Sequence, residues 1–274
     1  GAALGPPKQV PDSIKSARYE GGQMCVGYYP NKFPLLSVME LPFLLPRDVE
    51  KRAKVEAAVF AHPEIVKESS GRWNLRYFAP NILPAYEFMG NKPIRNVEDM
   101  KGVKMRISGL NAKALEQFGG VPTMVTAPEG YTALERGTID SFGFPYSYAF
   151  GAYKLYEVSK YVTDGVGMSG FMCWYGVSND AWKKMPDKIA AMLPKLQEEA
   201  NQKLFAAYKA ADEKWIPVFK ERLEVAAFPA EEREKLSAGA GAIWNQWAEE
   251  QEAAGRPGKT ILEFVKAEVA KVSK

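Results

Sequence analysis

The chain has 274 residues, of which 46% are hydrophobic and 25% are charged, so it can bury a large core and is more consistent with two domains than with one. Its formal charge of +3 comes from 36 basic and 33 acidic residues mixed along the sequence, and no basic stripe predicts binding to nucleic acid or to a membrane surface. Apolar runs such as 41–46 are too short to cross a bilayer. The composition predicts a soluble protein whose partner is a small molecule or another protein.

Strands and helices are predicted to alternate along the first two-thirds of the chain. The predicted elements are strands in QMCVGYY (23–29), WNLRYFA (73–79), MKGVKMRISG (100–109), VPTMV (121–125) and TIDSFGFP (138–145), and helices in RDVEKRAKVEAAVF (47–60), SGLNAKALEQFGG (108–120) and after the capping-box pair Thr126 and Glu129. This alternation predicts an α/β fold with a mostly parallel sheet.

The last third has a different character. A long amphipathic helix is predicted from Pro186 to about Phe219 because apolar residues recur every three or four positions. This stripe, which is expected to be core, consists of Leu193, Leu196, Ala200, Leu204, Tyr208, Ala211 and Trp215. Two closing helices are predicted to pack on the domains through Trp244, Trp247, Ile261, Phe264 and Val265.

Several catalytic and nucleotide-binding motifs are incomplete. His62 is the only histidine, which argues against a Ser-His-Asp catalyst and against a zinc site. The sequence GMSGF (167–171) lacks the second glycine of a nucleophile elbow, and GAGAIW (239–244) lacks the third glycine of a dinucleotide fingerprint. The P-loop-like sequence AAGRPGKT (253–260) is better explained as a helix that ends at Gly255 before a new helix capped near Thr260.

Two cysteines, Cys25 and Cys173, lie in strand-like apolar runs. We expect both to be buried thiols rather than a disulfide or a nucleophile. The sequence starts with GAALGPPKQ and shows no charged-then-apolar leader, so we expect that any targeting segment was removed or not included.

Arg106 lies near the end of the strand 100–109, with Lys104 on the same face and Val103, Met105 and Ile107 on the other. An arginine in this place is explained either by a surface ion pair or by an anion-binding site, because its planar fork matches a carboxylate. The residues of the strand alone leave both interpretations open.

The order of several motifs resembles a known family. These motifs are FPLLSVMELPFLLP (33–46), NKPIRNVEDMKGVKMRISG (91–109), GGVPTMVTAPEGYTALERGTIDS (119–141), and KLYEVSKYVTDG (154–165) followed by YGVSNDAWKKMP (175–186). Together they resemble the solute-binding proteins of tripartite ATP-independent periplasmic (TRAP) transporters, of the dicarboxylate-binding type. The resemblance runs from residue 1 to the sequence GRPGKTILEF near the carboxy terminus.

The resemblance implies a periplasmic two-domain clamp with intertwined domains and a long helix that spans both. We expect domain I to comprise 1–83 and 171–213, and domain II with the closing helices to comprise 84–170 and 214–274. Hinge rotation is expected near Leu83 to Glu87 and near Gly170 to Cys173. The resemblance also implies a strand, a helix and a further strand before the start of this sequence, which would make the chain less stable than a form that contains them.

The resemblance further implies a protein that captures a small organic acid and delivers it to membrane permease subunits. We expect a monomer without enzymatic activity, cofactor, metal or nucleic-acid partner. Two other classes stay open at this stage. An enzyme would use Arg106 to orient a small acid and Glu129 or Asp140 as base, and an adaptor module would bind no acid at all.

Arg106 matches the family arginine that grips the ligand carboxylate. Phe144 occupies the place of an asparagine that contacts ligand in sialic-acid-binding members, and Tyr86 lies near the place of their second arginine, so sialic acid is disfavoured. Further expected ligand-binding residues are Glu40, Tyr146, Trp174 and Tyr175. Phe142 shares a strand face with Phe144, and the resulting prediction is an aromatic-walled pocket.

Overall fold

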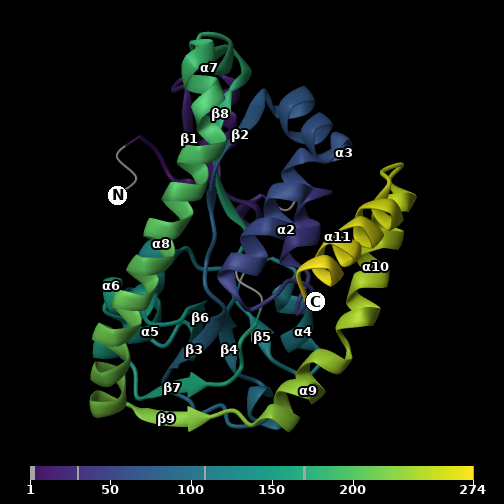
Figure 1. Cartoon of the computed structure of the whole chain (residues 1–274). Helices are drawn as coiled ribbons and strands as arrows, with labels where there is room; N and C mark the ends of the chain where they lie inside the picture. Colours follow the sequence, from purple (N-terminus) through teal and green to yellow (C-terminus); the bar gives the residue numbers. More distant parts are fainter. Residues whose placement is uncertain (1–3, 30, 108, 169–170, 274) are drawn as a thin grey trace.

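The computed structural model describes residues 4–29, 31–107, 109–168 and 171–273. Two β-sheets lie one above the other in Figure 1, with a long helix along one side and helices from the carboxy-terminal part of the chain along the other. The upper sheet has the strand order β1-β8-β2, and the lower sheet has the order β5-β4-β6-β3-β7-β9. The α/β fold class is confirmed.

The strands are short and come from distant parts of the chain. They are β1 (Gly21–Cys25), β2 (Leu75–Asn81), β3 (Tyr86–Gly90), β4 (Lys104–Arg106), β5 (Val121–Pro122), β6 (Ser141–Pro145), β7 (Tyr161–Asp164), β8 (Cys173–Ser178) and β9 (Glu224–Ala227). The α-helices are α1 (Val10–Lys15), α2 (Val49–Ala61), α3 (Pro63–Val66), α4 (Asn111–Glu116), α5 (Gly130–Glu135), α6 (Tyr148–Ala152), α7 (Asn179–Lys183), α8 (Asp187–Arg222), α9 (Ala230–Ala238), α10 (Ala240–Ala253) and α11 (Gly258–Ser273).

Strand direction differs between the two sheets. In the upper sheet, β8 lies between β1 and β2 and is antiparallel to both. In the lower sheet, β4 pairs in parallel with β5 and β6, and β7 with β9, whereas β3 is antiparallel to β6 and β7. The expectation of a mostly parallel sheet is therefore wrong for the upper sheet. Alternation of strands and helices does not show where a strand from later in the chain, such as β8, inserts.

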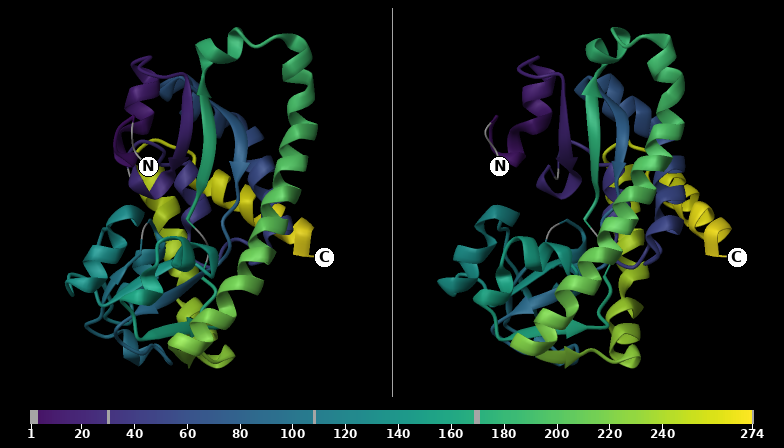
Figure 2. Two further views of the ribbon diagram at one scale, coloured as in Figure 1. Left: turned by 90° about the vertical axis from the view of Figure 1, so that its left-hand side faces the viewer. Right: turned by 60° about the vertical axis from the view of Figure 1, so that its left-hand side comes forward.

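Helix α8 runs along both sheets (Figures 1 and 2). The long helix is confirmed, but its stripe is less buried than predicted. Leu193 is buried and Tyr208 is half-buried, whereas Leu196 is 42% exposed and Ala200 is also exposed. The helix bridges two sheets from the outside, so it contacts protein mainly where a sheet lies beneath it. Tyr208 also donates a hydrogen bond to the Ile82 carbonyl at 2.8 Å.

The closing helices pack as predicted. Trp247, Ile261 and Val265 are buried, and the Trp244 indole donates to the Pro42 carbonyl at 2.9 Å. Helix α10 ends just before Gly255, whose positive φ of 72° terminates it, which confirms the helix stop predicted in the P-loop-like sequence. The next helix begins at Gly258, slightly before the predicted start.

Besides helix α8, which leads from β8 to β9, two shorter chain segments connect the sheets. Residues 82–85 lead from β2 into β3, and the segment that starts at Gly165 leads from β7 towards β8. Tyr86 and Met168 form an isolated bridge between these connections, with N–H to O distances of 3.0 and 3.2 Å. Part of the second predicted hinge, at Gly170, lies outside the described residues. The domain boundaries and the hinge rotation stay predictions.

Candidate functional site

Arg106 is buried at the junction of the two sheets. Its relative exposure is 0%, because β4 ends at this residue and the segments before β8 and after β1 cover the side chain. Its Nε donates to the Val125 carbonyl and its Nη1 to the Gly143 carbonyl, both at 2.9 Å. Among the described residues, no carboxylate lies within ion-pair distance of the guanidinium.

This burial excludes one of the two interpretations of Arg106. The surface ion pair is wrong, because the side chain has no exposed surface and no carboxylate partner among the described residues. The side chain is also closed off from solvent by other parts of the protein. A ligand that reaches Arg106 has to displace what covers it.

Three aromatic rings surround the guanidinium. The Arg106 Cζ lies 4.6 Å from the Phe142 ring centroid, 5.2 Å from that of Phe144 and 5.9 Å from that of Phe171. Phe142 is opposite Arg106 in the parallel pairing of β4 with β6, and Phe144 follows on the same face. Each ring face is attractive to the cation. The predicted aromatic surroundings are therefore present, although their role in ligand binding stays a proposal.

Tyr28 completes the cover of the site. Its hydroxyl lies 3.5 Å from the Arg106 Nη2, at the limit of hydrogen-bond distance. Its ring meets Phe171 edge to face at 5.0 Å. Tyr28 and Phe171 are site residues that the sequence did not indicate. They come from the segment after β1 and from the approach to β8, which are far apart in sequence, and only their common position near Cys25 and Cys173 could have linked them.

Tyr86 lies beside the ring cluster. Its ring is edge to face with Phe144 at 6.3 Å. The residue is 1% exposed, and its hydroxyl has no hydrogen-bond partner among the described residues. Burial raises the pKa of Tyr86, and the nearby Arg106 charge opposes that rise. An unpartnered buried hydroxyl that is close to a guanidinium is a second polar group available to a ligand.

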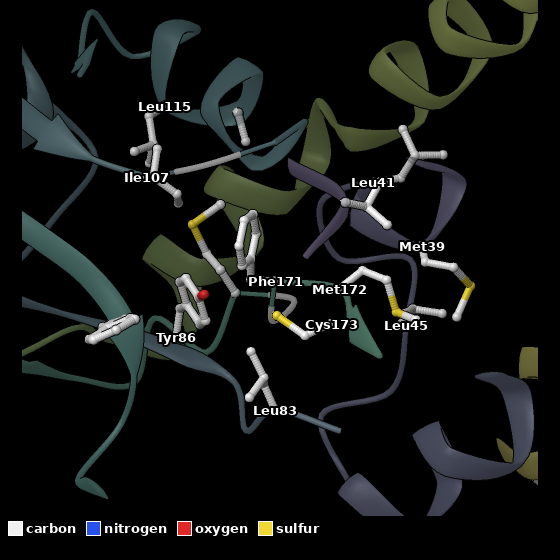
Figure 3. Packing of buried hydrophobic residues seen from close by; sticks show 14 of the residues in the cluster. Met39, Leu41, Leu45, Leu83, Tyr86, Ile107, Leu115, Phe171, Met172 and Cys173 are labelled. Carbon is white, nitrogen blue, oxygen red and sulfur yellow. The ribbon is translucent and has the colours of Figure 1, made fainter. Parts of the chain in front are cut away.

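Glu40 is also close to the site but contacts backbone. The residue is 1% exposed, and its Oε1 accepts from the Gly27 N–H at 2.9 Å and from the Met172 N–H at 3.2 Å. Burial raises the pKa of Glu40 to about 8. Glu40 is therefore a buried carboxyl group and not a surface charge. Figure 3 shows Phe171, Met172 and Cys173 between Ile107 and Tyr86 on one side and Met39 and Leu45 on the other.

Three of the expected residues lie elsewhere. Trp174 has 0% exposure and packs against Phe33 and Phe60, with centroids 6.2 and 5.1 Å away. Tyr175 is the next residue of β8, so its side chain is on the opposite face, and it is 42% exposed. Tyr146 packs on Phe219 beneath α8. None of the three rings is among the groups that contact Arg106.

The bacterial extracellular solute-binding protein family 7 model matches residues 1–251. The chain belongs to this family. A monocarboxylate 2-oxoacid-binding periplasmic protein of Nostoc is 26% identical over 212 residues, which are 76% of this chain and 57% of that protein. The chain therefore spans somewhat more than half the length of this curated relative.

Solved structures of TRAP solute-binding proteins share the fold of this family 7 chain. A marine metagenome protein specific for aromatic acid ligands, in complex with metahydroxyphenylacetate, has a TM-score of 0.84 at 20% identity over 98% of this chain and 85% of that one. A Desulfovibrio salexigens protein with bound orotic acid has a TM-score of 0.85 at 22% identity over 99% and 86%. At this identity the likeness establishes the fold.

The two cysteines of this family 7 chain form a disulfide. Cys25 and Cys173 are opposite each other in the antiparallel pairing of β1 with β8, and their Cα atoms are 4.0 Å apart. The expectation of two reduced thiols is wrong. The cysteines are 148 residues apart, and the sequence does not show that their strands are neighbours.

Three further features of the described residues concern metal binding, membrane insertion and a second pocket. Among the described residues, no group of three or more His, Cys, Asp or Glu side chains could hold a metal ion. Within the same part of the chain, every helix is too short or too polar to span a membrane. A surface pocket of about 390 Å³, lined by Arg72, Trp247 and Arg256 among others, does not include Arg106.

Proposed function

We propose that the chain is the periplasmic solute-binding subunit of a TRAP transporter. It captures a small organic acid between its two sheets and delivers it to membrane permease subunits. It acts as a monomer without cofactor and performs no chemistry on the acid. The observation that carries this proposal is the buried Arg106 guanidinium, which has no carboxylate partner among the described residues.

The hydrogen bonds of Arg106 leave room for an anion. An arginine has five N–H donors, and the short bonds to the Val125 and Gly143 carbonyls occupy one on Nε and one on Nη1. Of the remaining donors, those on Nη2 lie near Tyr28, whose hydroxyl is 3.5 Å from Nη2. A ligand carboxylate that replaces this weak contact forms charge-assisted hydrogen bonds and neutralises a charge that has lost its hydration.

The surroundings favour an acid with an aromatic or apolar body. Phe142, Phe144 and Phe171 contact the guanidinium, so a carboxylate bound there places the rest of the ligand among rings. The fold neighbours with metahydroxyphenylacetate and orotic acid, together with the 2-oxoacid-binding relative, support a monocarboxylate. We propose an aromatic monocarboxylate as the ligand class.

No observation favours the enzyme alternative. Glu129 accepts from the backbone N–H and hydroxyl of Thr126 and so caps its own helix. Asp140 accepts from the Lys104 N–H at 2.9 Å and pairs with Lys92 at 3.3 Å. Both carboxylates have local roles, and neither is among the groups that contact Arg106.

A calorimetric titration tests the proposal. A thermal-shift screen over benzoate, mandelate, pyruvate and succinate first identifies the best acid. Arg106→Ala should then weaken its binding by roughly 2 to 5 kcal/mol, or about thirtyfold to several thousandfold, because the buried carboxylate loses its partner. Arg106→Lys should retain only part of the affinity that Arg106→Ala loses, since an ammonium cannot form two parallel hydrogen bonds.

Lys104→Ala is the matched control. It removes an exposed cation from the same strand and should leave affinity within about twofold, as for a solvated charge. An Arg106→Ala variant that is folded and binds the acid as the wild type does would refute the assignment. Recovery of the acid unchanged after incubation distinguishes a binding protein from an enzyme.

A further inference from the structure

Two segments that cover Arg106 are fastened to each other at three points. The disulfide joins Cys25 to Cys173. The Val26 N–H donates to the Met172 carbonyl at 2.9 Å. The third point is Glu40, whose Oε1 accepts from an N–H of each segment. We call the disulfide, this backbone hydrogen bond and Glu40 the staple.

Each stapled segment leads directly to an aromatic ring at the site. Tyr28 follows Cys25 by three residues and touches the Arg106 Nη2 through its hydroxyl. Phe171 precedes Cys173 by two residues and lies over the same guanidinium. The two rings also contact each other edge to face. The staple therefore holds Tyr28 and Phe171 as one unit.

Glu40 also contacts the segment that follows the arginine strand. A Cβ added to Gly109 would lie 2.0 Å from the Glu40 Oε2, and one added to Gly27 would lie 2.9 Å from it. The absence of a side chain at these two glycines lets the carboxylate lie between them. One buried side chain thus touches both the ring-bearing segments and the chain just beyond Arg106, and it fixes their spacing.

We propose that Glu40 and the Cys25–Cys173 disulfide are positioning groups of the ligand site, which hold Tyr28 and Phe171 against Arg106 and so determine the preference for aromatic acids. This inference rests on the proposed function. It assigns no ligand contact to Glu40. If Glu40 and the disulfide only stabilised the fold, loosening them would instead weaken the binding of all acids to the same extent.

A glutamine is a close mimic of Glu40. Both N–H groups donate to one oxygen, Oε1, and a glutamine carbonyl can accept two hydrogen bonds. Burial raises the pKa of Glu40 to about 8, so the wild-type group is mainly protonated at pH 7 and an amide preserves its charge state. Leucine has a similar size but removes both acceptors.

The test compares the affinities for benzoate and propionate by calorimetry. Two variants loosen the staple: Glu40→Leu, and the double variant Cys25→Ser with Cys173→Ser. Each should lower the affinity for benzoate about three- to tenfold, as expected for lost aromatic contacts. Propionate should change less, so that the benzoate-to-propionate ratio falls. Glu40→Gln should keep both affinities within about twofold. Trp247→Phe, which loses a hydrogen bond to Ser37 and changes a ring that is not among the described ring contacts of Tyr28 and Phe171, controls for general destabilisation.

Two outcomes would overturn the proposal. One is an unchanged ratio in the loosened variants, and the other is the same ratio change in Trp247→Phe. If the wild type binds acids through Arg106 but the ratio does not move, only the positioning role fails. If the wild type binds no acid, both proposals fail. Should a loosened variant not fold, amide hydrogen exchange at Gly27 and Met172 in Glu40→Gln gives the answer, because a working mimic must keep both amides protected.

Discussion

A buried guanidinium with no counter-charge among the described residues is unusual in a protein that has no ligand bound. Arg106 recovers part of its lost hydration from two carbonyls and three ring faces. Ring faces attract a cation by about 0.5 to 2 kcal/mol each, which is small compared with the several kcal/mol that burial of an ion costs. The unsatisfied part of this cost is what an acid can relieve on binding.

Phe144 should affect which acid binds. Phe144→Leu removes a ring that contacts Arg106 at 5.2 Å but keeps an apolar side chain. We expect the affinity for benzoate to fall about three- to tenfold, since an aromatic pair contributes about 0.5 to 1.5 kcal/mol beyond its buried area. The affinity for propionate should change less. Calorimetric titration measures both.

Phe150→Leu is the matched control for Phe144. Phe150 belongs to the same ring cluster, 6.4 Å from Phe144, and is not among the rings that contact the guanidinium. It should shift stability without shifting the benzoate-to-propionate ratio. Equal ratios in wild type and Phe144→Leu would contradict a ligand-facing Phe144.

At the scale of elements, the connection from β7 towards β8 is held by one carboxylate. Glu87 of β3 accepts from the Thr163 hydroxyl at 2.6 Å and from the Gly165, Val166 and Gly167 N–H groups at 2.9 to 3.3 Å. Arg233 of α9 donates to the Val166 carbonyl at 3.1 Å. The connection is thus fixed next to the point where it bridges to Tyr86.

Glu87→Ala should therefore be strongly destabilising. It leaves three backbone N–H groups without an acceptor, and each such group costs about 1 to 3 kcal/mol when buried. We therefore expect the free energy of unfolding, measured by urea denaturation, to fall by at least about 3 kcal/mol. Glu87→Gln should lose less because it retains one acceptor oxygen. Glu234→Ala, which removes an exposed carboxylate of α9, should stay within about 0.5 kcal/mol. Equal losses for Glu87→Ala and Glu234→Ala would contradict this role.

Local elements were predictable, but their long-range arrangement was not. The Thr126–Glu129 capping box and the helix stop at Gly255 depend on neighbours in sequence, and both are confirmed. The pairing of Cys25 with Cys173 depends on β8 inserting between β1 and β2, which no local pattern specifies. For the same reason Tyr28 and Phe171 escaped notice, and Trp174 was predicted at the site although its face of β8 points into the core.

At the scale of the whole molecule, several buried carboxylates make the stability depend on pH in one direction. Burial raises the pKa of Glu40 to about 8 and that of Glu68 to about 7, from an ordinary value of 4.5. Burial also raises the pKa of Glu87. Glu68 accepts from the Leu35 and Leu36 N–H groups at 2.8 and 2.9 Å, so protonation is tied to the fold of a segment that also carries Glu40.

The protein should therefore be more stable at pH 5 than at pH 8. Between pH 4.5 and 7 for Glu68, and up to pH 8 for Glu40, the folded chain retains a proton that the unfolded chain has lost. The free energy of unfolding then falls as pH rises, by about 1.4 kcal/mol per pH unit for each such group. Urea denaturation at both values measures the difference, and Glu40→Gln with Glu68→Gln should flatten it because an amide does not titrate. Glu234→Gln should leave the slope unchanged. A midpoint at pH 8 that equals or exceeds the midpoint at pH 5 would show that these carboxylates are ionised in the folded protein.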